Sequence, residues 1–533
     1  MFMTGGEGYC RFRAPTEDGE RLAVPRWQDW PSLIQHNREA IQANRAELLG
    51  RPLAELARET RQETLQAAKR GSSQYLDALP NADPAQPLIV TGHQPELYHP
   101  GVWLKNSAAS QLAQQLGGAA LNVVIDSDLA RTPSIRVPLI DNGNAAYTPV
   151  AFDASDTPVP HEQRRVRDHG LLDSFAARVA ESGASVLENP LVQGWWPTVV
   201  DRCKATDCLS RGIAEARHRR ESDWGIPLLQ VPLSGLAETS GFRWLVASLI
   251  HQHERVAPVY NECLADYRRA HRLRTNAQPM PDLAVEDGWH ELPLWAWTDA
   301  DPTRRGVVAR RLGNDIELSN RQQPLATLPA GDAAAIADAL AVLADRGIKV
   351  RTRALMTTAF FRYFVSDLFI HGIGGAKYDQ ITDRVCQQLF GSPPPPHATL
   401  SGTLRLPTEI DTRANQRAAE AAMRLRDARF HPERLLPSVH LPVEARREAE
   451  LLSKTKAEWI ATEKTAANAA ERHRAIDQAN ASLRQLIDPE RSKIEESLEQ
   501  ARCAARNARV LGSREYSFCL FPEDVVRNFL LDF

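Results

Sequence analysis

Short apolar runs alternate with a longer helical pattern between residues 86 and 125. Residues 87–91 form a compact apolar run bounded by turn residues, which is typical of a buried strand. Residues 102–116 have apolar positions at helical spacing and stop at two glycines, a common end signal for a helix. A second apolar run follows at 120–125. Strand, helix and strand within about 40 residues predict a βαβ unit and therefore a parallel sheet.

Helical patterns dominate the segments on both sides of this unit. We expect helices across 27–75 and most of 151–283, and further helices at 333–345, 353–369 and 378–390. The Gly-Asn-Asp turn at 313–315 predicts a hairpin. Strands are expected at 292–297, 306–311, 316–318 and 348–350.

The last third of the chain is rich in Ala, Glu, Arg, Lys and Gln and follows a stiff, proline-rich linker at 391–396. Residues 410–429 predict one helix. Residues 443–487 predict an unusually long one, which would extend for about 65–70 Å. Asp488-Pro489 ends it, and a shorter helical stretch at 490–508 completes an antiparallel coiled-coil arm. Residues 516–521 have the pattern of a terminal strand that returns to the core.

These patterns predict an α/β protein with a parallel-sheet core, mostly helical insertions and a C-terminal antiparallel coiled-coil arm. The expected organisation is an N-terminal helical segment (1–85), the first part of the core (86–150), a helical connecting region (151–285), a small β-hairpin region (286–330), the second part of the core with a glycine loop (331–407), the coiled-coil arm (408–508) and a C-terminal segment that returns to the core (509–533).

Composition narrows the class of protein. The chain has 533 residues, and 43% of them are hydrophobic, which is enough for a packed core. Its 64 Lys and Arg residues nearly balance 67 Asp and Glu residues, so we expect no nucleic-acid partner. The length alone fits three to four domains of roughly 150 residues. The pattern favours one core with insertions and an arm.

The apolar stretches and the cysteines indicate in which cellular compartment the protein is located. The most apolar stretch, 354–370, is interrupted by Arg362 and Asp367 and is too short to cross a bilayer of about 30 Å. The first 15 residues lack the basic start and apolar run of a signal peptide. We therefore expect a cytoplasmic protein with no membrane partner. The cysteines are scattered, as in a reducing compartment: Cys10, Cys203, Cys208, Cys263, Cys386, Cys503 and Cys519.

Polar residues follow both strands of the predicted βαβ unit. Gly92, His93 and Gln94 come after the first strand, and Asp126 and Asp128 come after the second. Ligands bind at the carboxyl ends of strands in open α/β sheets, so we expect these side chains to meet around a ligand. His93 could donate to a phosphate or act as an acid or base. The helix between the strands adds the positive charge of Lys105. The alternative is that Gly92 only makes a turn and that His93 caps a helix or packs.

Asp126 and Asp128 have two further interpretations. Alternate carboxylates can hold Mg²⁺ or Mn²⁺ against a diphosphate, as in transferases that use a nucleotide sugar. They can equally cap a helix or accept hydrogen bonds from a substrate. We assign no metal ligand from the sequence.

A glycine-rich loop beginning at His371 is the second strong feature. Three glycines in four positions leave backbone N–H groups free to hold an anion where a helix begins. The loop has neither the dinucleotide-binding nor the P-loop spacing, and we expect a helix to precede it. The alternative is a tight connection between two packed helices. The ligand residues of this loop would be His371, Gly372, Gly374, Gly375, Lys377 and Tyr378; functional positive charge is expected at Lys105, Arg351, Arg353 and Lys377.

The two loops, in this order, resemble those of the bacillithiol synthase family. The segment Thr91-Gly-His-Gln94, then Pro100-Gly101 and Lys105, is similar to a Thr-Gly-Gln-Gln loop with Gly-Pro and a helical lysine after it. Ile125-Asp-Ser-Asp128 is similar to the family's acidic strand end. His371-Gly-Ile-Gly-Gly375 with Tyr378 is similar to its Gly-Gly-Pro-Gly-Glu loop and following Tyr.

The chain departs from the family at several of these positions. The family's first loop Gln is His93 here, its Glu-Asp-His-Asp cluster is reduced to Asp126 and Asp128, and the Pro and Glu of its second loop are absent. The chain therefore resembles a divergent member of the family.

The resemblance implies a Rossmann-like core related to class I aminoacyl-tRNA synthetases, and a homodimer formed through the coiled coil. It also implies a ligase that joins cysteine, or a related amine, to a glucosamine–malate conjugate. The cofactor stays open, with ATP or another nucleotide as the candidate. His93, Asp126 and Asp128 would be catalytic, and the other loop residues named above would bind substrate or nucleotide. The alternatives are a nucleotide-sugar-dependent transferase with a metal at Asp126 and Asp128, and a non-catalytic coiled-coil scaffold.

Overall fold

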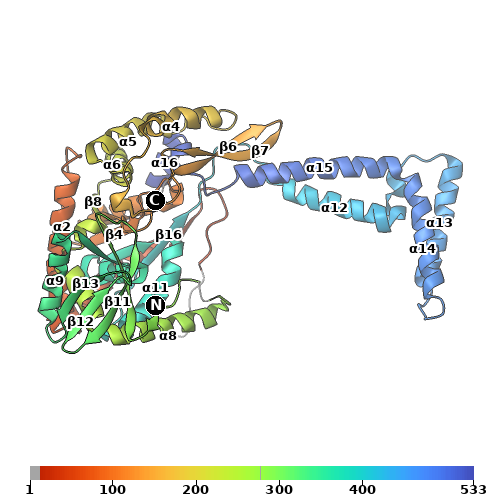
Figure 1. Cartoon of the computed structure of the whole chain (residues 1–533). Helices are drawn as coiled ribbons and strands as arrows, with labels where there is room; N and C mark the ends of the chain where they lie inside the picture. Colours follow the sequence, from red (N-terminus) through yellow and green to blue (C-terminus); the bar gives the residue numbers. More distant parts are fainter. Residues whose placement is uncertain (1–11, 156, 276–277, 533) are drawn as a thin grey trace. The chain divides into compact units, whose positions relative to one another are not determined.

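A computed structural model describes residues 12–155, 157–275 and 278–532 of the chain (Figure 1). The described residues divide into two compact units. The first contains the residues up to Val137, Pro149–Arg405 and those from Arg514 onward; the second contains Pro138–Thr148 and Leu406–Ser513. Cys10 lies outside the described residues. Within the described part of the chain, no helix has both the length and the apolar character needed to cross a membrane.

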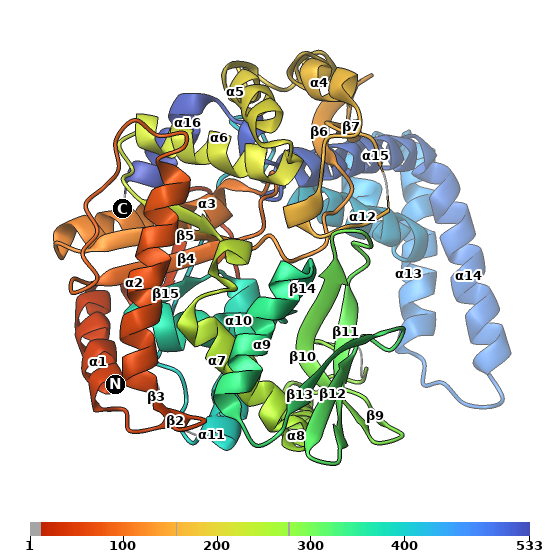
Figure 2. The same ribbon diagram turned by 60° about the vertical axis from the view of Figure 1, so that its left-hand side comes forward.

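The core of the first unit is a six-stranded sheet, most of it parallel (Figure 2). Its strands are β1 (Arg21–Val24), β4 (Leu88–His93), β5 (Ala119–Val124), β8 (Leu229–Pro232), β15 (Leu368–His371) and β16 (Ala398–Gly402). They lie side by side in the order β1-β16-β15-β4-β5-β8, and only the pairing of β1 with β16 is antiparallel. The predicted βαβ unit and parallel sheet are thus confirmed.

The strand order reverses at the centre of this sheet. After β4 the chain passes through α3 (Pro100–Gln115) to β5 on one side, and after β15 it passes through α11 (Ile373–Phe390) to β16 on the other. The two connections leave in opposite directions, so the carboxyl ends of β4 and β15 flank a crevice of the kind that binds ligands in open α/β sheets.

Burial explains why the central strands are apolar without alternation. Leu88, Ile89 and Val90 of β4 and every residue of β5 are buried, as expected for strands covered on both faces.

Two cis peptide bonds precede Pro25 and Pro279. The other helices of this unit are α1 (Trp30–Ala43), α2 (Leu53–Ser72), α4 (His169–Ser182), α5 (Val192–Thr206), α6 (Leu209–Asp223), α7 (Ser240–His251), α8 (His253–His271), α9 (Ala333–Asp345), α10 (Ala354–Phe360) and α16 (Glu523–Leu531).

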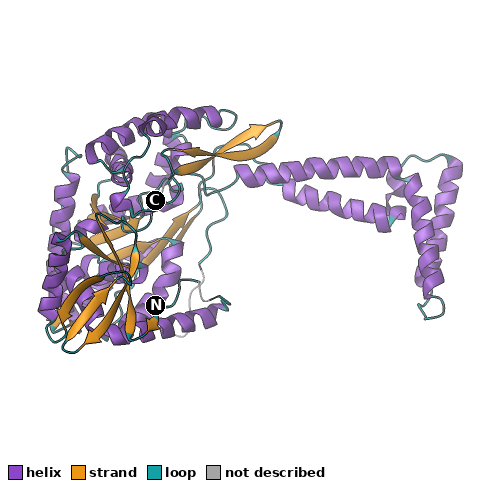
Figure 3. Cartoon of the chain, in the orientation of Figure 1, coloured by secondary structure: helices purple, strands orange, loops and turns teal. Residues whose placement is uncertain are grey.

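A second, antiparallel sheet extends the predicted hairpin region (Figure 3). The predicted hairpin is confirmed as β11 and β12, and the helix predicted at 333–345 is α9. The strand predicted at 348–350 exists, but it pairs with β10 here and not with the core, so the predicted boundary at 330 is wrong. The strands are β9 (Val285–Glu286), β10 (Trp289–Thr298), β11 (Arg305–Leu312), β12 (Asp315–Ser319), β13 (Pro324–Pro329) and β14 (Ile348–Thr352).

Several predicted helices are interrupted. The segment 27–75 contains a short hairpin of β2 (Glu47–Leu48) and β3 (Arg51–Pro52), because Leu49 and Gly50 turn the chain with positive φ angles. The helix predicted at 353–369 is confirmed only in part. This segment contains α10 and a π-helical turn (Phe361–Val365), but it ends in the parallel strand β15. The helical region 151–283 likewise contains β8.

The second unit contains helix pairs in place of one long arm helix. The predicted helix 443–487 is divided into α13 (Val443–Ala461) and α14 (Ala469–Leu486), which pack against each other. The helices α12 (Ala414–Phe430) and α15 (Asp488–Leu511) form another pair. A small core of Ala428, Leu435, Ile487 and Ile494 belongs to this unit. The hairpin of β6 (Ser134–Asp141) and β7 (Asn144–Ala151) lies partly in it.

The predicted terminal strand at 516–521 is also wrong. This segment forms a 3₁₀ turn (Phe518–Leu520), and α16 follows and packs on α3. The segment does return to the first unit, because Phe518, Leu520 and Phe521 are fully buried there. The proline-rich stretch at 391–396 leads into β16, so it connects two parts of the parallel sheet.

Candidate functional site

The two loops singled out in the sequence line one cavity of about 460 Å³ at the carboxyl ends of β4 and β15. The parallel sheet brings them together although almost 280 residues separate them in the chain. Ten of the predicted site residues line this cavity: Gly92, His93, Gln94, Lys105, Asp128, His371, Gly372, Gly374, Gly375 and Lys377. Asp126 and Tyr378 do not.

The first loop presents polar groups that are held in place. Lys105 is buried, and its Nζ donates to the Gly92 carbonyl oxygen over 2.8 Å. Burial, with Arg217 nearby, lowers the pKa of Lys105 to about 7. His93 donates through Nδ1 to the Gln94 carbonyl oxygen over 3.1 Å, and burial together with Lys105 lowers its pKa to about 3. The His93 imidazole is therefore neutral at pH 7, and its free ring nitrogen can accept a hydrogen bond.

Gly92 is required by the sheet itself. A Cβ atom at this position would lie 2.9 Å from the Val123 carbonyl oxygen on β5. The close approach of the two strands thus accounts for this glycine, which lies within β4 and not in the turn that the alternative expected.

Asp126 and Asp128 face different surroundings. Asp128 accepts from Gln94 Nε2 over 2.6 Å and from Arg304 Nη1 over 2.8 Å, at the edge of the cavity. Asp126 is buried and accepts from both the backbone N–H and the hydroxyl of Ser234. Burial and the neighbouring Glu162 raise the pKa of Asp126 to about 7. The two carboxylates do not converge on one point, and donors already occupy both.

The second loop begins a helix directly after a strand. The predicted helix before the loop is β15, and α11 begins at Ile373, five residues earlier than the predicted 378. In the described part of the chain, the N–H groups of Ile373, Gly374 and Gly375 have no hydrogen-bond acceptor. Lys377 lies beside them on the cavity wall. This arrangement suits an anionic group, because free N–H groups and the helix dipole both attract negative charge.

Tyr378 points elsewhere. Its side chain is 36% exposed and is not part of the cavity wall.

Sequence reasoning missed a cation contributed by the C-terminal segment. Arg514 lines the cavity and donates through Nη2 to Ser401 Oγ over 3.2 Å. Its buried Nη1 has no hydrogen-bond partner among the described residues. The only sequence signal was the predicted return of this segment to the core, which did not specify Arg514.

Two arginines expected to be functional are paired elsewhere. Arg351 forms a 3.0 Å ion pair with Glu162, and Arg353 forms one of 2.5 Å with Glu291. Neither residue lines the cavity. The local positive charge there comes from Lys105, Lys377 and Arg514.

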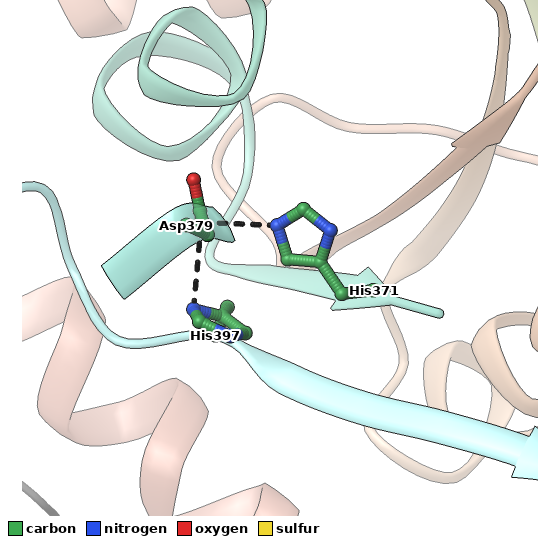
Figure 4. A group of neighbouring side chains, drawn as sticks. All are labelled: His371, Asp379 and His397. Carbon is green, nitrogen blue, oxygen red and sulfur yellow. Dashed lines mark hydrogen bonds and ion pairs between the residues drawn. The ribbon is translucent and has the colours of Figure 1, made fainter. Parts of the chain in front are cut away.

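A buried cluster lies behind His371 (Figure 4). His371 donates through Nε2 to Asp379 Oδ2 over 3.0 Å, and His397 Nδ1 lies 3.5 Å from the same oxygen. Arg362 Nη1 also reaches this oxygen, over 2.5 Å. Burial alone would raise the pKa of Asp379, but Arg362 and His371 together hold it below its usual range. Asp379 therefore stays ionised and fixes the orientation of His371.

A larger cavity, of about 810 Å³, lies at the ends of β5 and β8. Asp126, Glu162 and Ser234 are part of its wall. It contains neither the glycine loop nor His93, so the smaller cavity is the stronger candidate site although it has less volume.

The fold and the site define an α/β protein with a cavity at the point where the strand order of its parallel sheet reverses. No protein-family model matches the chain, and no curated protein matches it either.

Proposed function

We propose that the protein is a ligase-like enzyme that resembles bacillithiol synthase and adds cysteine, or a related amine, to a small sugar-acid conjugate. One observation carries the proposal: the two loops on which the resemblance rests line the same cavity. The strand order 3-2-1-4-5 of β4, β5, β8, β15 and β16 supports the proposed Rossmann-like core.

The chemistry of amide formation assigns roles to the residues of the cavity. An activated carboxylate and a free amine must meet, and ATP or another nucleotide would supply the activating phosphate. The free N–H groups at the start of α11, with Lys377 and Arg514, would hold that phosphate and stabilise it as it leaves. His93, neutral at pH 7, would accept a hydrogen bond from the incoming amine and orient it. Gln94 and Asp128 would orient the substrate at the cavity edge.

The alternatives explain less of the geometry. A nucleotide-sugar transferase with a metal at Asp126 and Asp128 needs two carboxylates that face one ion, whereas these two are engaged by Ser234, Gln94 and Arg304. A scaffold without catalytic function gives no reason for both loops and Lys377 to line one cavity.

A mass-spectrometric assay tests this proposal. The full chain is incubated with ATP, cysteine and a glucosamine–malate conjugate, and the condensed product is measured. We expect His93→Ala and Lys377→Ala to abolish product formation while both variants keep the wild-type circular dichroism spectrum. Lys349→Ala, in the wall of the larger cavity, is the matched control and should remain active. Full activity of both cavity variants would exclude the assigned roles.

We also propose that the protein is a cytoplasmic homodimer formed through the second unit. Met423 and Phe430, one heptad apart on α12, are 61% and 48% exposed. Two large apolar side chains on one helix face are typical of a surface that a partner covers. The six described cysteines are all unpaired, which supports the cytoplasmic location.

A further inference from the structure

The buried cluster of His371, Asp379 and His397 has the composition of a metal site (Figure 4). His371 is the last residue of β15, Asp379 lies on α11, and His397 immediately precedes β16. One nitrogen from each imidazole and one oxygen of the carboxylate lie within 4.8 Å of one another. Three successive elements of the chain therefore bring their ligand atoms close together.

Hydrogen bonding leaves this cluster incomplete. Both imidazoles and Arg362 approach the same atom, Asp379 Oδ2. The other carboxylate oxygen, Oδ1, is buried and has no hydrogen-bond partner among the described residues, although the Asp379 side chain is only 1% exposed. A buried carboxylate oxygen without a partner is costly and indicates that a group is missing from the cluster.

We propose that His371, Asp379 and His397 bind a divalent transition-metal ion. Two imidazoles and a carboxylate form a ligand set typical of zinc or iron, and nitrogen donors disfavour Mg²⁺ and Ca²⁺. Tetrahedral ligands at about 2.0 Å from an ion are about 3.3 Å apart. The separations of 3.0 Å and 3.5 Å between the two nitrogens and Asp379 Oδ2 bracket that value.

The charges around the cluster favour a cation. Arg362 contacts Asp379 and also Asp383, over 2.5 Å and 2.7 Å, so one guanidinium faces two carboxylates. The remaining negative charge would attract a cation, and Arg362 would remain as the outer partner that positions Asp379. Arg362 is itself held by the carbonyl oxygens of Pro394 and Pro395.

The ion would fix the beginning of α11 relative to the sheet. Its ligands join the end of β15, the second turn of α11 and the start of β16, and among them only His371 is part of the cavity wall. We therefore assign it a structural role behind the cavity, and this inference does not depend on the proposed ligase activity.

Metal analysis of the full chain, purified without a histidine tag, tests the inference. After incubation with Zn²⁺ and extensive dialysis, we expect one zinc per chain by inductively coupled plasma mass spectrometry. Zn²⁺ should also raise the melting temperature. His397→Gln should lose both effects, since its side chain keeps the volume and loses one ligand. His440→Ala removes an exposed histidine of the second unit and should behave as the wild type.

Two results would overturn the inference. One is a wild-type chain that retains no zinc after dialysis, which leaves the cluster as a hydrogen-bonded group only. The other is zinc retained equally by wild type and by His397→Gln, which places the ion elsewhere. The melting temperature in the presence of a chelator shows whether His397→Gln folds, so loss of zinc through unfolding is recognised.

Discussion

Gly374 and Gly375 are neighbours in the first turn of α11, but their surroundings differ. A Cβ atom at Gly375 would lie 2.5 Å from His371 Nδ1, whereas one at Gly374 would meet nothing within 4 Å. His371 cannot easily move away, because Asp379 holds its ring. We therefore predict that Gly375→Ala destabilises the first unit by about 1–3 kcal/mol. Gly374→Ala is the matched control and should be neutral or stabilising by up to about 1 kcal/mol.

Denaturant unfolding followed by tryptophan fluorescence measures this difference, since every tryptophan except Trp459 lies in the first unit. Equal stability of the two alanine variants would show that His371 is not packed against Gly375.

Lys105 makes the stability depend on pH. Its pKa is about 7 in the folded protein, well below the ordinary value for lysine, so between about pH 7 and pH 10 the unfolded chain binds more protons than the folded one. Stability contributed at this position therefore rises with pH across that window, by up to about 1.4 kcal/mol per unit. We predict that wild type gains stability relative to Lys105→Met as the pH increases from 7 to 10. A difference that stays constant would contradict the lowered pKa.

At the scale of single residues, the sequence indicated candidate site residues better than it indicated which residues they contact. His93 and Lys377 could be chosen because each lies in a short motif at a strand end or helix start. Arg514 and His397 could not, since only tertiary structure brings them to the cavity and to Asp379. The sequence also could not show that the Asp126 side chain faces Ser234, because the two residues are 108 positions apart in the chain.

Among the elements, the π-helical turn before β15 contributes the buried Arg362. Its guanidinium contacts Asp379, Asp383 and two proline carbonyls, so truncation leaves buried groups without partners. We predict that Arg362→Ala destabilises the first unit by about 3–5 kcal/mol. Arg165→Ala breaks an ion pair with Asp207 whose side chains are both about 70% exposed, and it should change stability by less than about 1 kcal/mol. Similar unfolding midpoints in urea for both variants would refute the structural role of Arg362.

Element type was predictable where a pattern was long or bounded by glycine. The helix α3 and the strands β4 and β5 follow this rule. The strand β15 was missed because its short apolar run follows the helical residues 354–365 after only two residues, so the two patterns merge in the sequence. The prediction of one long helix at 443–487 is wrong because the helical spacing of apolar residues continues through the turn between α13 and α14. Only the packing of the two helices produces that turn.

At the scale of the whole molecule, the second unit carries the proposed dimer. Replacing both Met423 and Phe430 with Glu places charge on the exposed face of α12. We predict that this double variant is a monomer in size-exclusion chromatography with light scattering, whereas wild type is a dimer. The paired variant Glu420→Gln with Arg424→Gln changes other side chains of the same helix and should remain a dimer. A monomeric wild type would disprove the proposal.

The strand order could not be predicted from the sequence as a whole. A βαβ unit fixes only β4 and β5 as neighbours, whereas β8 and β15 join them from segments more than 100 and 270 residues away. That order is nevertheless what unites the two loops in one cavity.

The central claim is that this cavity binds the phosphate of a ligand. Isothermal titration of ATP into wild type, Lys377→Ala and Lys349→Ala tests it most directly. Loss of a charged hydrogen bond, worth about 1.5–3 kcal/mol, should weaken binding to Lys377→Ala by roughly tenfold or more. Lys349→Ala, in the larger cavity, should bind as wild type does. Equal affinity of wild type and Lys377→Ala, or a loss confined to Lys349→Ala, would contradict the account.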